Sequence, residues 1–434
     1  MTKTVSKWRC TDLGAIRMST IGWGGQPLFF PGWRGPVGTA SPASLSLVFL
    51  LCCSAPAFAA YVPDDPDTVY ALIGYRHDDN VLLLNPSISV PPGNGSSSRG
   101  DTITTYTIGG QYKKDWSRQT FTFNSEFSRN QYQNYTGADY TNWDNGLAWN
   151  WVAADQLTGK LSATDSNTLA GASTAVLSSH DVIRDKEQKG SAHWAMNSVW
   201  EWVGELEHLS ERHQALDIYD FDQTYEALDL IAHGNGGKSL GVRAETRQVR
   251  YVQDLSFFGW NNDYKMQILS LHGEWPLGAR LVLSGRAGST RITTDSNLVD
   301  ETHAVGEATA RWNTGGKSQF TLDYEHDYDS PGRSFAPSAI QHDIARIDFA
   351  WMLTAKTTLN GEWRTEKRHY PTINVFNLQG VGPENTRTYQ LSVQWQPRQN
   401  VSISPYYEHT VRSSQSIYDT YRDNQLGVTL QVNF

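Results

Sequence analysis

The residues best suited to chemistry in this sequence are few and far apart. His180 follows Ser178 and Ser179, which is the nearest approach to a nucleophile beside a base. A working site also needs a third group that orients the imidazole, and no neighbouring residue is placed to do so. We therefore expect no catalytic residues, and a rim enzyme acting on lipid or glycan stays only as a third alternative.

Two clusters of aspartates offer the oxygen ligands that divalent cations prefer. They are Asp217, Asp220 and Asp222, and Asp323, Asp327 and Asp329. Solvated surface charge explains such clusters more often than a metal does, and no phosphate-binding loop or cofactor motif accompanies them. We expect no metal, no cofactor and no enzymatic activity.

Charge and hydropathy exclude two further classes. The formal net charge of −9 disfavours a nucleic-acid partner, because such proteins present basic surfaces to phosphate. The longest apolar run, near Leu47 to Cys53, is much shorter than the roughly 20 residues that a membrane-spanning helix needs. A helical membrane protein is therefore not expected.

The same apolar run has the form of a secretory signal. It is followed by Ala57, Phe58 and Ala59, an A-x-A cleavage site that predicts a mature chain starting at Ala60. We divide the chain into residues 1–59, a signal peptide with an unusually long N-terminal extension, and residues 60–434, the folded domain. All three cysteines precede the cut, so the mature chain has no disulfide or thiolate chemistry.

The segment Gln425 to Phe434 indicates the fold. Its apolar residues alternate strictly with polar or small ones, which is the pattern of a strand with one apolar face. No later residue remains to cover that face, so lipid is the best candidate. The residues of this predicted barrel-closing strand that face the lipid are Leu426, Val428, Leu430, Val432 and Phe434.

A unit of about forty residues recurs along the chain. Each unit has two alternating strands, a short polar turn such as Lys113 to Gln119, and a longer polar loop. An aromatic residue precedes seven of the turns, and His233 takes its place before another. A β-propeller also repeats at this length, but its blades hold four short strands instead of two long ones. We predict an all-β, transmembrane antiparallel barrel of about 18 strands.

The aromatic residues before the turns have an interfacial explanation, because indole and phenol rings settle between hydrocarbon and headgroups. The predicted membrane-interface girdle comprises Tyr112, Trp151, Trp194, Trp275, Trp312, Trp351 and Trp395.

The polar phase of each strand predicts the interior. The candidate lumen-lining residues are Glu205, Glu207, Arg243, Glu245, Arg247, Asp323, Glu325, Arg346, Asp348, Glu362, Arg364, Glu366 and Arg368. These charges either pair across strands and stabilise a wet interior or set the solute preference of a pore. The alternation breaks near Ala227 and Leu228, and near Ile268 and Leu269, which suggests bulges or a misplaced register.

The mature chain resembles the EpsL-type proteins of exopolysaccharide biosynthesis operons, which are associated with exosortase systems. The resemblance is carried by Asp78 to Val81, Gln111 to Trp116 and Phe121 to Gln133. It implies an outer-membrane β-barrel that helps a polysaccharide across the membrane, and it transfers no catalytic residue.

The sequence thus predicts a Gram-negative outer-membrane protein. Its leading expected function is a non-enzymatic channel or scaffold for exopolysaccharide export. A general or solute-specific uptake porin is the alternative. The expected partners are outer-membrane lipid, a polysaccharide and proteins of an export system, with no nucleic acid.

Overall fold

The computed structural model describes residues 67–90, 98–170, 180–253, 263–294, 300–329, 340–369, 383–415 and 417–434. The predicted signal peptide, its cleavage site, the three cysteines, Ser178 and Ser179 lie outside these ranges. The described strands are β1 (Thr68–Asp78), β2 (Asp101–Trp116), β3 (Gln119–Tyr132), β4 (Tyr140–Ala154), β5 (Leu157–Leu169), β6 (Val182–Ala195), β7 (Trp200–His213), β8 (Phe221–His233), β9 (Ser239–Tyr251), β10 (Tyr264–Leu277), β11 (Leu281–Thr294), β12 (Asp300–Asn313), β13 (Ser318–Asp329), β14 (Ile340–Thr354), β15 (Thr357–His369), β16 (Glu384–Arg398), β17 (Val401–Ser413) and β18 (Tyr421–Asn433).

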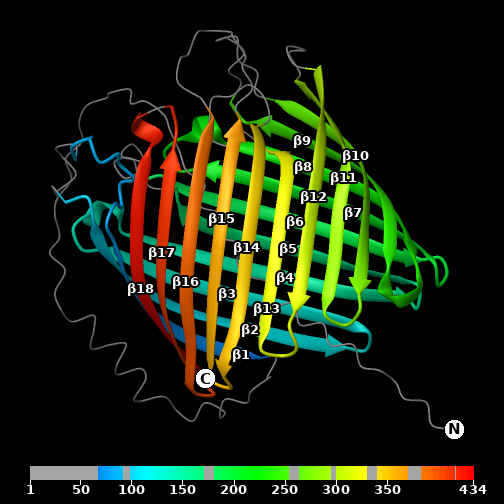
Figure 1. The fold of residues 1–434 in the computed structure, drawn as a ribbon, viewed down its shortest axis with the longest axis horizontal. Helices are drawn as coiled ribbons and strands as arrows, with labels where there is room; N and C mark the ends of the chain where they lie inside the picture. Colours follow the sequence, from blue (N-terminus) through cyan, green and yellow to red (C-terminus); the bar gives the residue numbers. More distant parts are fainter. Residues whose placement is uncertain are drawn as a thin grey trace.

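These eighteen strands form one closed antiparallel sheet (Figure 1). Each strand pairs with its neighbours in the chain, and β18 pairs with β1 through a register that joins Leu430 to Ile73. Closure leaves no free sheet edge, which is the condition for strands to cross a membrane. The predicted fold and its strand number are confirmed.

One rim carries tight turns, and these are shorter than the sequence predicts. The expected turn at Lys113 to Gln119 is wrong in its bounds, because β2 continues to Trp116 and only Ser117 and Arg118 connect it to β3. Tyr112, Lys114 and Trp116 continue to point outward, and Lys113 and Asp115 continue to point inward. The pairing of β2 with β3 therefore runs without a break to Trp116 and Gln119. Ser117 adopts a positive φ of 56°, which reverses the chain within two residues.

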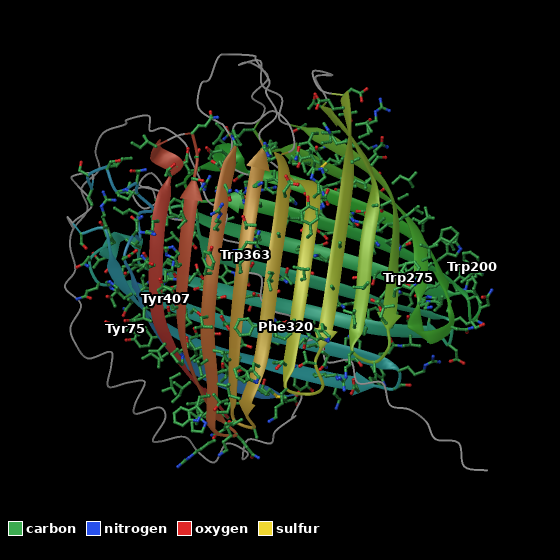
Figure 2. The ribbon with its side chains drawn as sticks, in the orientation of Figure 1. Tyr75, Trp200, Trp275, Phe320, Trp363 and Tyr407 are labelled. Carbon is green, nitrogen blue, oxygen red and sulfur yellow. The ribbon has the colours of Figure 1, made fainter. Side chains whose placement is uncertain are left out.

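The outer face is apolar across the middle of the wall and aromatic towards its ends. Leu228, Leu322 and Leu426 are each more than half exposed, as expected for side chains that meet lipid. Trp200, Trp275 and Phe320 lie on this face in Figure 2, as do Tyr75, Trp363 and Tyr407. Among the described residues, no helix is long and apolar enough to span a membrane.

The predicted bulges near Ala227 and Ile268 are wrong. Both pairs of strands run in continuous register there, and the register shifts of the described ladders lie near the turns instead, as at Val152 and Ala154. Ala227 and Ile268 simply face the interior, where they are 9% and 5% exposed. Ile268 belongs to an apolar cluster on the inner wall, and this cluster is what breaks the alternation.

That inner apolar cluster lies at the end of the barrel that carries the long connections. Its buried members are Phe221, Val249, Tyr264, Met266, Ile268, Ile292, Val305 and Tyr328. A second cluster forms where the segment after β1 packs on Ile103 of β2, with Leu82 only 1% exposed.

Asn80 fixes the segment after β1. Its side-chain amide donates to the carbonyls of Leu84 and Arg422 at 2.9 and 2.7 Å, and its oxygen accepts from the Leu84 N–H at 3.0 Å. These bonds tie residues 80–84 to the first residues of β18.

Candidate channel interior

The inner face of the barrel is polar, and the pairing registers identify it. The exposed leucines of β7 to β10 lie at positions of the paired strands that point outward. The positions between them point inward and carry the charges. All thirteen candidate lumen-lining residues occupy these inward positions. They come from β7 (Glu205, Glu207), β9 (Arg243, Glu245, Arg247), β13 (Asp323, Glu325), β14 (Arg346, Asp348) and β15 (Glu362, Arg364, Glu366, Arg368).

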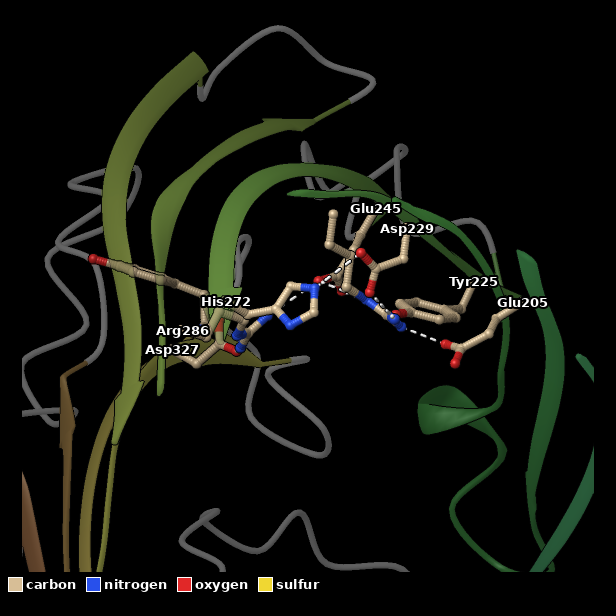
Figure 3. A network of polar contacts seen from close by, with 9 residues as sticks. Glu205, Tyr225, Asp229, Glu245, His272, Arg286 and Asp327 are labelled. Carbon is tan, nitrogen blue, oxygen red and sulfur yellow. Dashed lines mark hydrogen bonds and ion pairs between the residues drawn. The ribbon is translucent and has the colours of Figure 1, made fainter. Parts of the chain in front are cut away.

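The densest polar network centres on Arg243 (Figure 3). Its guanidinium forms an ion pair with Glu205 on β7, which crosses the whole width of β8. The same side chain donates to the Tyr225 hydroxyl at 2.7 Å and lies 3.3 Å from Glu245 and 3.6 Å from Asp229. One cation therefore compensates several carboxylates that would otherwise repel one another.

The network continues around the wall through Arg286 of β11. Its two terminal nitrogens bind Glu245 at 3.1 Å and Asp327 at 2.7 Å. His272 closes the other side, with Nε2 2.9 Å from an oxygen of Asp229. The sequence offered no signal for Arg286, Asp229 or His272, because their roles depend on which strands become neighbours.

Further ion pairs cover the strands from β13 to β17. Arg346 lies 3.3 Å from Asp323 and 2.8 Å from Asp348. Glu366 accepts from Arg364 at 2.8 Å and from Arg368 at 2.5 Å. Most of the predicted interior charges thus have a partner on the same or a neighbouring strand.

The two sides of the interior differ in charge. Within the described β2 to β8, no arginine faces inward, because Arg129, Arg184 and Arg212 occupy outward positions. The same strands carry many inward carboxylates but only three inward lysines, Lys113, Lys160 and Lys189. The inward carboxylates are Asp101, Asp115, Glu126, Asp144, Asp185, Glu187, Glu201, Glu205, Glu207, Glu211 and Asp229. Inward arginines come from β1 and from β9 onwards. The β2–β8 side is therefore the more negative wall.

A carboxylate between two imidazoles lies on that wall near the short turns. Glu201 contacts His193 Nδ1 at 3.0 Å and His233 Nε2 at 2.7 Å. His233, which stands in the place of an aromatic marker in the repeat, faces inward and does not extend the girdle.

The girdle residues all occupy outward positions close to the short turns. Tyr112, Trp194, Trp275, Trp312, Trp351 and Trp395 are between 43% and 52% exposed, and Trp151 shares their register. The structure adds Trp116, Trp149 and Trp200 to this rim. It also shows a second aromatic row towards the long loops, with Tyr75, Trp363, Tyr389 and Tyr407, which the repeat marker did not identify. Of the predicted closing strand, Leu426, Val428 and Leu430 are exposed on the outer face and Val432 continues the same register. Phe434 follows the end of β18, and its backbone N–H donates to the Val69 carbonyl at 2.8 Å.

The candidate chemical groups have structural partners. Asp222 binds Arg212 at 2.8 Å, and Asp220 accepts from the His213 N–H at 2.6 Å. Burial raises the pKa of the Asp220 carboxyl, against the opposing hydrogen bond from His213. His180 Nδ1 lies 3.0 Å from the Gly137 carbonyl. Across the part of the chain that the structure describes, no group of three or more His, Cys, Asp or Glu residues is arranged to hold a metal.

Comparison with known proteins gives structural similarities only. No family model matches the chain, and no curated protein matches it, so the resemblance to EpsL-type proteins finds no support. Acinetobacter baumannii OccAB3 aligns over 86% of this chain and 100% of its own, with 9% identity and a TM-score of 0.46. Pseudomonas aeruginosa OccK2 (10%, TM-score 0.47) covers 85% and 98%, and a BenF-like porin from Pseudomonas fluorescens (10%, TM-score 0.47) covers 86% and 99%.

The class of protein follows from the chain's own geometry. A closed barrel with a lipid-compatible outer face, aromatic residues towards both ends and a polar interior is a porin-like barrel of the Gram-negative outer membrane.

Proposed function

We propose that the chain is a non-enzymatic outer-membrane channel through which small hydrophilic solutes enter the cell. The observation that supports this most is the inner wall, which carries ion-paired charges from β7 to β17 inside an eighteen-strand barrel. Barrels of this strand number leave room for an aqueous path. The polar groups of the wall can form hydrogen bonds that replace part of the hydration shell that a solute loses when it enters the barrel.

The unequal walls point to the charge preference of the channel. Carboxylates outnumber cations on the inward side of β2 to β8, so cations and solutes with an ammonium group are attracted there. Neutral sugars are neither attracted nor repelled. Strongly anionic solutes are repelled by the more negative wall.

Uptake of small solutes accounts for the interior better than export of a polymer. The arginine and glutamate side chains around Arg243, and the segment that holds Leu82 against Ile103, occupy space along the inner wall. Both narrow the path that an extended polysaccharide would need, whereas small solutes need less width.

Liposome swelling tests the proposal directly. Vesicles containing the purified barrel should swell in neutral monosaccharides and disaccharides, at rates that fall with solute size. Deleting the gene should leave surface polysaccharide intact. Vesicles that stay impermeable to every solute, or loss of surface polysaccharide without loss of solute uptake, would contradict the proposal.

A further inference from the structure

Three cations share a small area of the outer face, on the sector formed by β15 to β18. Lys367 of β15, Arg387 of β16 and Arg422 of β18 all occupy outward register positions and are exposed. We call this set the outer basic cluster. It lies on the lipid side of the wall, so it is separate from the channel interior.

Strand pairing brings the three residues together. Arg387 pairs with Val411, and Val411 pairs with Arg422, so the two arginines stand two strands apart, or about 10 Å. Arg387 also pairs with Thr365, two positions from Lys367 on β15. The three side chains are long enough to converge on one or two anionic groups.

The outer basic cluster differs from three outward arginines elsewhere on the barrel that have carboxylate partners. Arg184 binds Asp165 at 2.9 Å, Arg212 binds Asp222 at 2.8 Å and Arg291 binds Asp300 at 2.7 Å. Each of these pairs neutralises its own arginine, while Lys186, Arg250 and Lys265 also face outward on β6, β9 and β10. Lys367, Arg387 and Arg422 have no ion-pair partner among the residues that the structure describes.

Two outward carboxylates border the cluster: Asp343 of β14, which stands opposite Lys367 and contacts His326 Nδ1 at 2.6 Å, and Asp79 in the segment after β1. On the described β15 to β18, no outward position holds Asp or Glu. The Asp79 carboxylate, in the segment after β1, is engaged by the backbone and side-chain N–H groups of Asn424 at 2.8 and 2.6 Å. Three cations thus face two bordering carboxylates that have other hydrogen-bond partners, and the outer basic cluster keeps a net positive charge.

The depth of the cluster identifies the group that covers it. Trp363, Tyr389 and Tyr407 form the aromatic row on the same sector, and each cation lies further towards the long-loop rim than this row (Figure 2 labels Trp363 and Tyr407). Aromatic rings mark the boundary between hydrocarbon and headgroups. Long loops mark the external side of such barrels, so the cations lie at the headgroup level of the outer leaflet.

We propose that the outer basic cluster binds the phosphate groups of an anionic lipid of the outer leaflet. Arginine supplies paired N–H donors that match phosphate oxygens, and lysine adds a point charge. The acyl chains of the same lipid lie on the apolar wall below, against Leu391 and Leu426, which are 47% and 63% exposed. Headgroup and chains are thus recognised by one continuous surface. This site does not depend on the proposed channel function.

Binding of bis-phosphorylated lipid A to the detergent-purified full-length protein, followed by native mass spectrometry, tests the site. The triple variant K367Q/R387Q/R422Q should lose binding about tenfold, the equivalent of ~1.4 kcal/mol. The matched control R184Q/R212Q/R291Q removes the same charge from ion-paired outer positions and should change binding less than twofold. Lipid A stripped of its phosphates should bind the native protein as weakly as bis-phosphorylated lipid A binds the triple variant.

Three results would overturn the proposal. They are equal losses in the two triple variants, unchanged binding in K367Q/R387Q/R422Q, or binding that ignores the phosphates. Heat-modifiable migration on gels verifies that each variant is folded. The conservative variant K367R, which keeps the charge, should bind like the native protein even if the glutamine variants fold poorly. Because each cation faces away from the interior, single-channel conductance should be the same in every folded variant.

Discussion

Arg286 on β11 donates to Asp327 on β13 at 2.7 Å, so the bond crosses the width of β12. A second nitrogen of the same guanidinium holds Glu245 on β9 at 3.1 Å. One side chain therefore links strands on both sides of its own. Such links along the inner wall position the charges that a passing solute meets.

Replacing Arg286 with glutamine should destabilise the barrel. Glu245 and Asp327 are largely buried and would lose a charged donor, which costs about 2 kcal/mol. Urea unfolding of the detergent-solubilised protein measures the change. The double variant R286Q/D327N should recover part of the loss. A single variant as stable as the native protein would show that the bridge contributes nothing.

The carboxylates of β7 should control ion selectivity. Glu205 and Glu207 face inward on the more negative wall. A carboxylate a few ångströms from a permeating cation stabilises that cation by about 1 kcal/mol in a water-like medium, and removal of the charge loses this stabilisation. We expect E207Q to lower the ratio of cation to anion permeability about fivefold at low salt. The outward substitution E226Q should leave this ratio unchanged.

Tyr70 and Gly109 give a prediction about packing. The Tyr70 ring passes over Gly109 of β2, and its hydroxyl donates to Glu126 of β3 at 2.5 Å. A Cβ on Gly109 would lie 2.5 Å from the ring, so G109A must displace it. We expect a loss of about 2 kcal/mol in unfolding free energy. The control G204A, where nothing lies within 4 Å of the added carbon, should be neutral or slightly stabilising.

The segment after β1 should depend on Asn80. In N80A the bonds to Leu84 and Arg422 are lost, and each contributes about 1 kcal/mol. Hydrogen exchange at the Leu82 and Leu84 amides should accelerate at least tenfold, while exchange in β18 stays slow. Unchanged exchange at Leu82 would contradict the anchoring role of Asn80.

The alternation of Gln425 to Phe434 was sufficient to predict a strand that meets lipid, because side-chain direction in a strand is a local property. The forty-residue repeat similarly predicted the strand number, since each unit is one hairpin. The direction of the interior charges also follows from local phase, and the pairing registers place every one of the thirteen on the inner side.

What the sequence did not predict depends on the register between strands. Ile268 and Ala227 suggest a bulge because apolar residues are rare on a wet inner wall. Only the neighbouring strands reveal the cluster that buries Ile268 and the inward position of Ala227. The contact of Glu201 with His233, and the group formed by Arg387 and Arg422, likewise join residues about thirty positions apart. No spacing rule within one strand contains that information.

The reversal potential of the purified barrel in a planar bilayer, under a tenfold potassium chloride gradient, tests the central claim most directly. The channel account predicts stable ohmic conductance steps and a reversal potential whose sign shows preference for potassium, reduced in E207Q. A bilayer that shows no conductance, or a channel that prefers chloride, would contradict it.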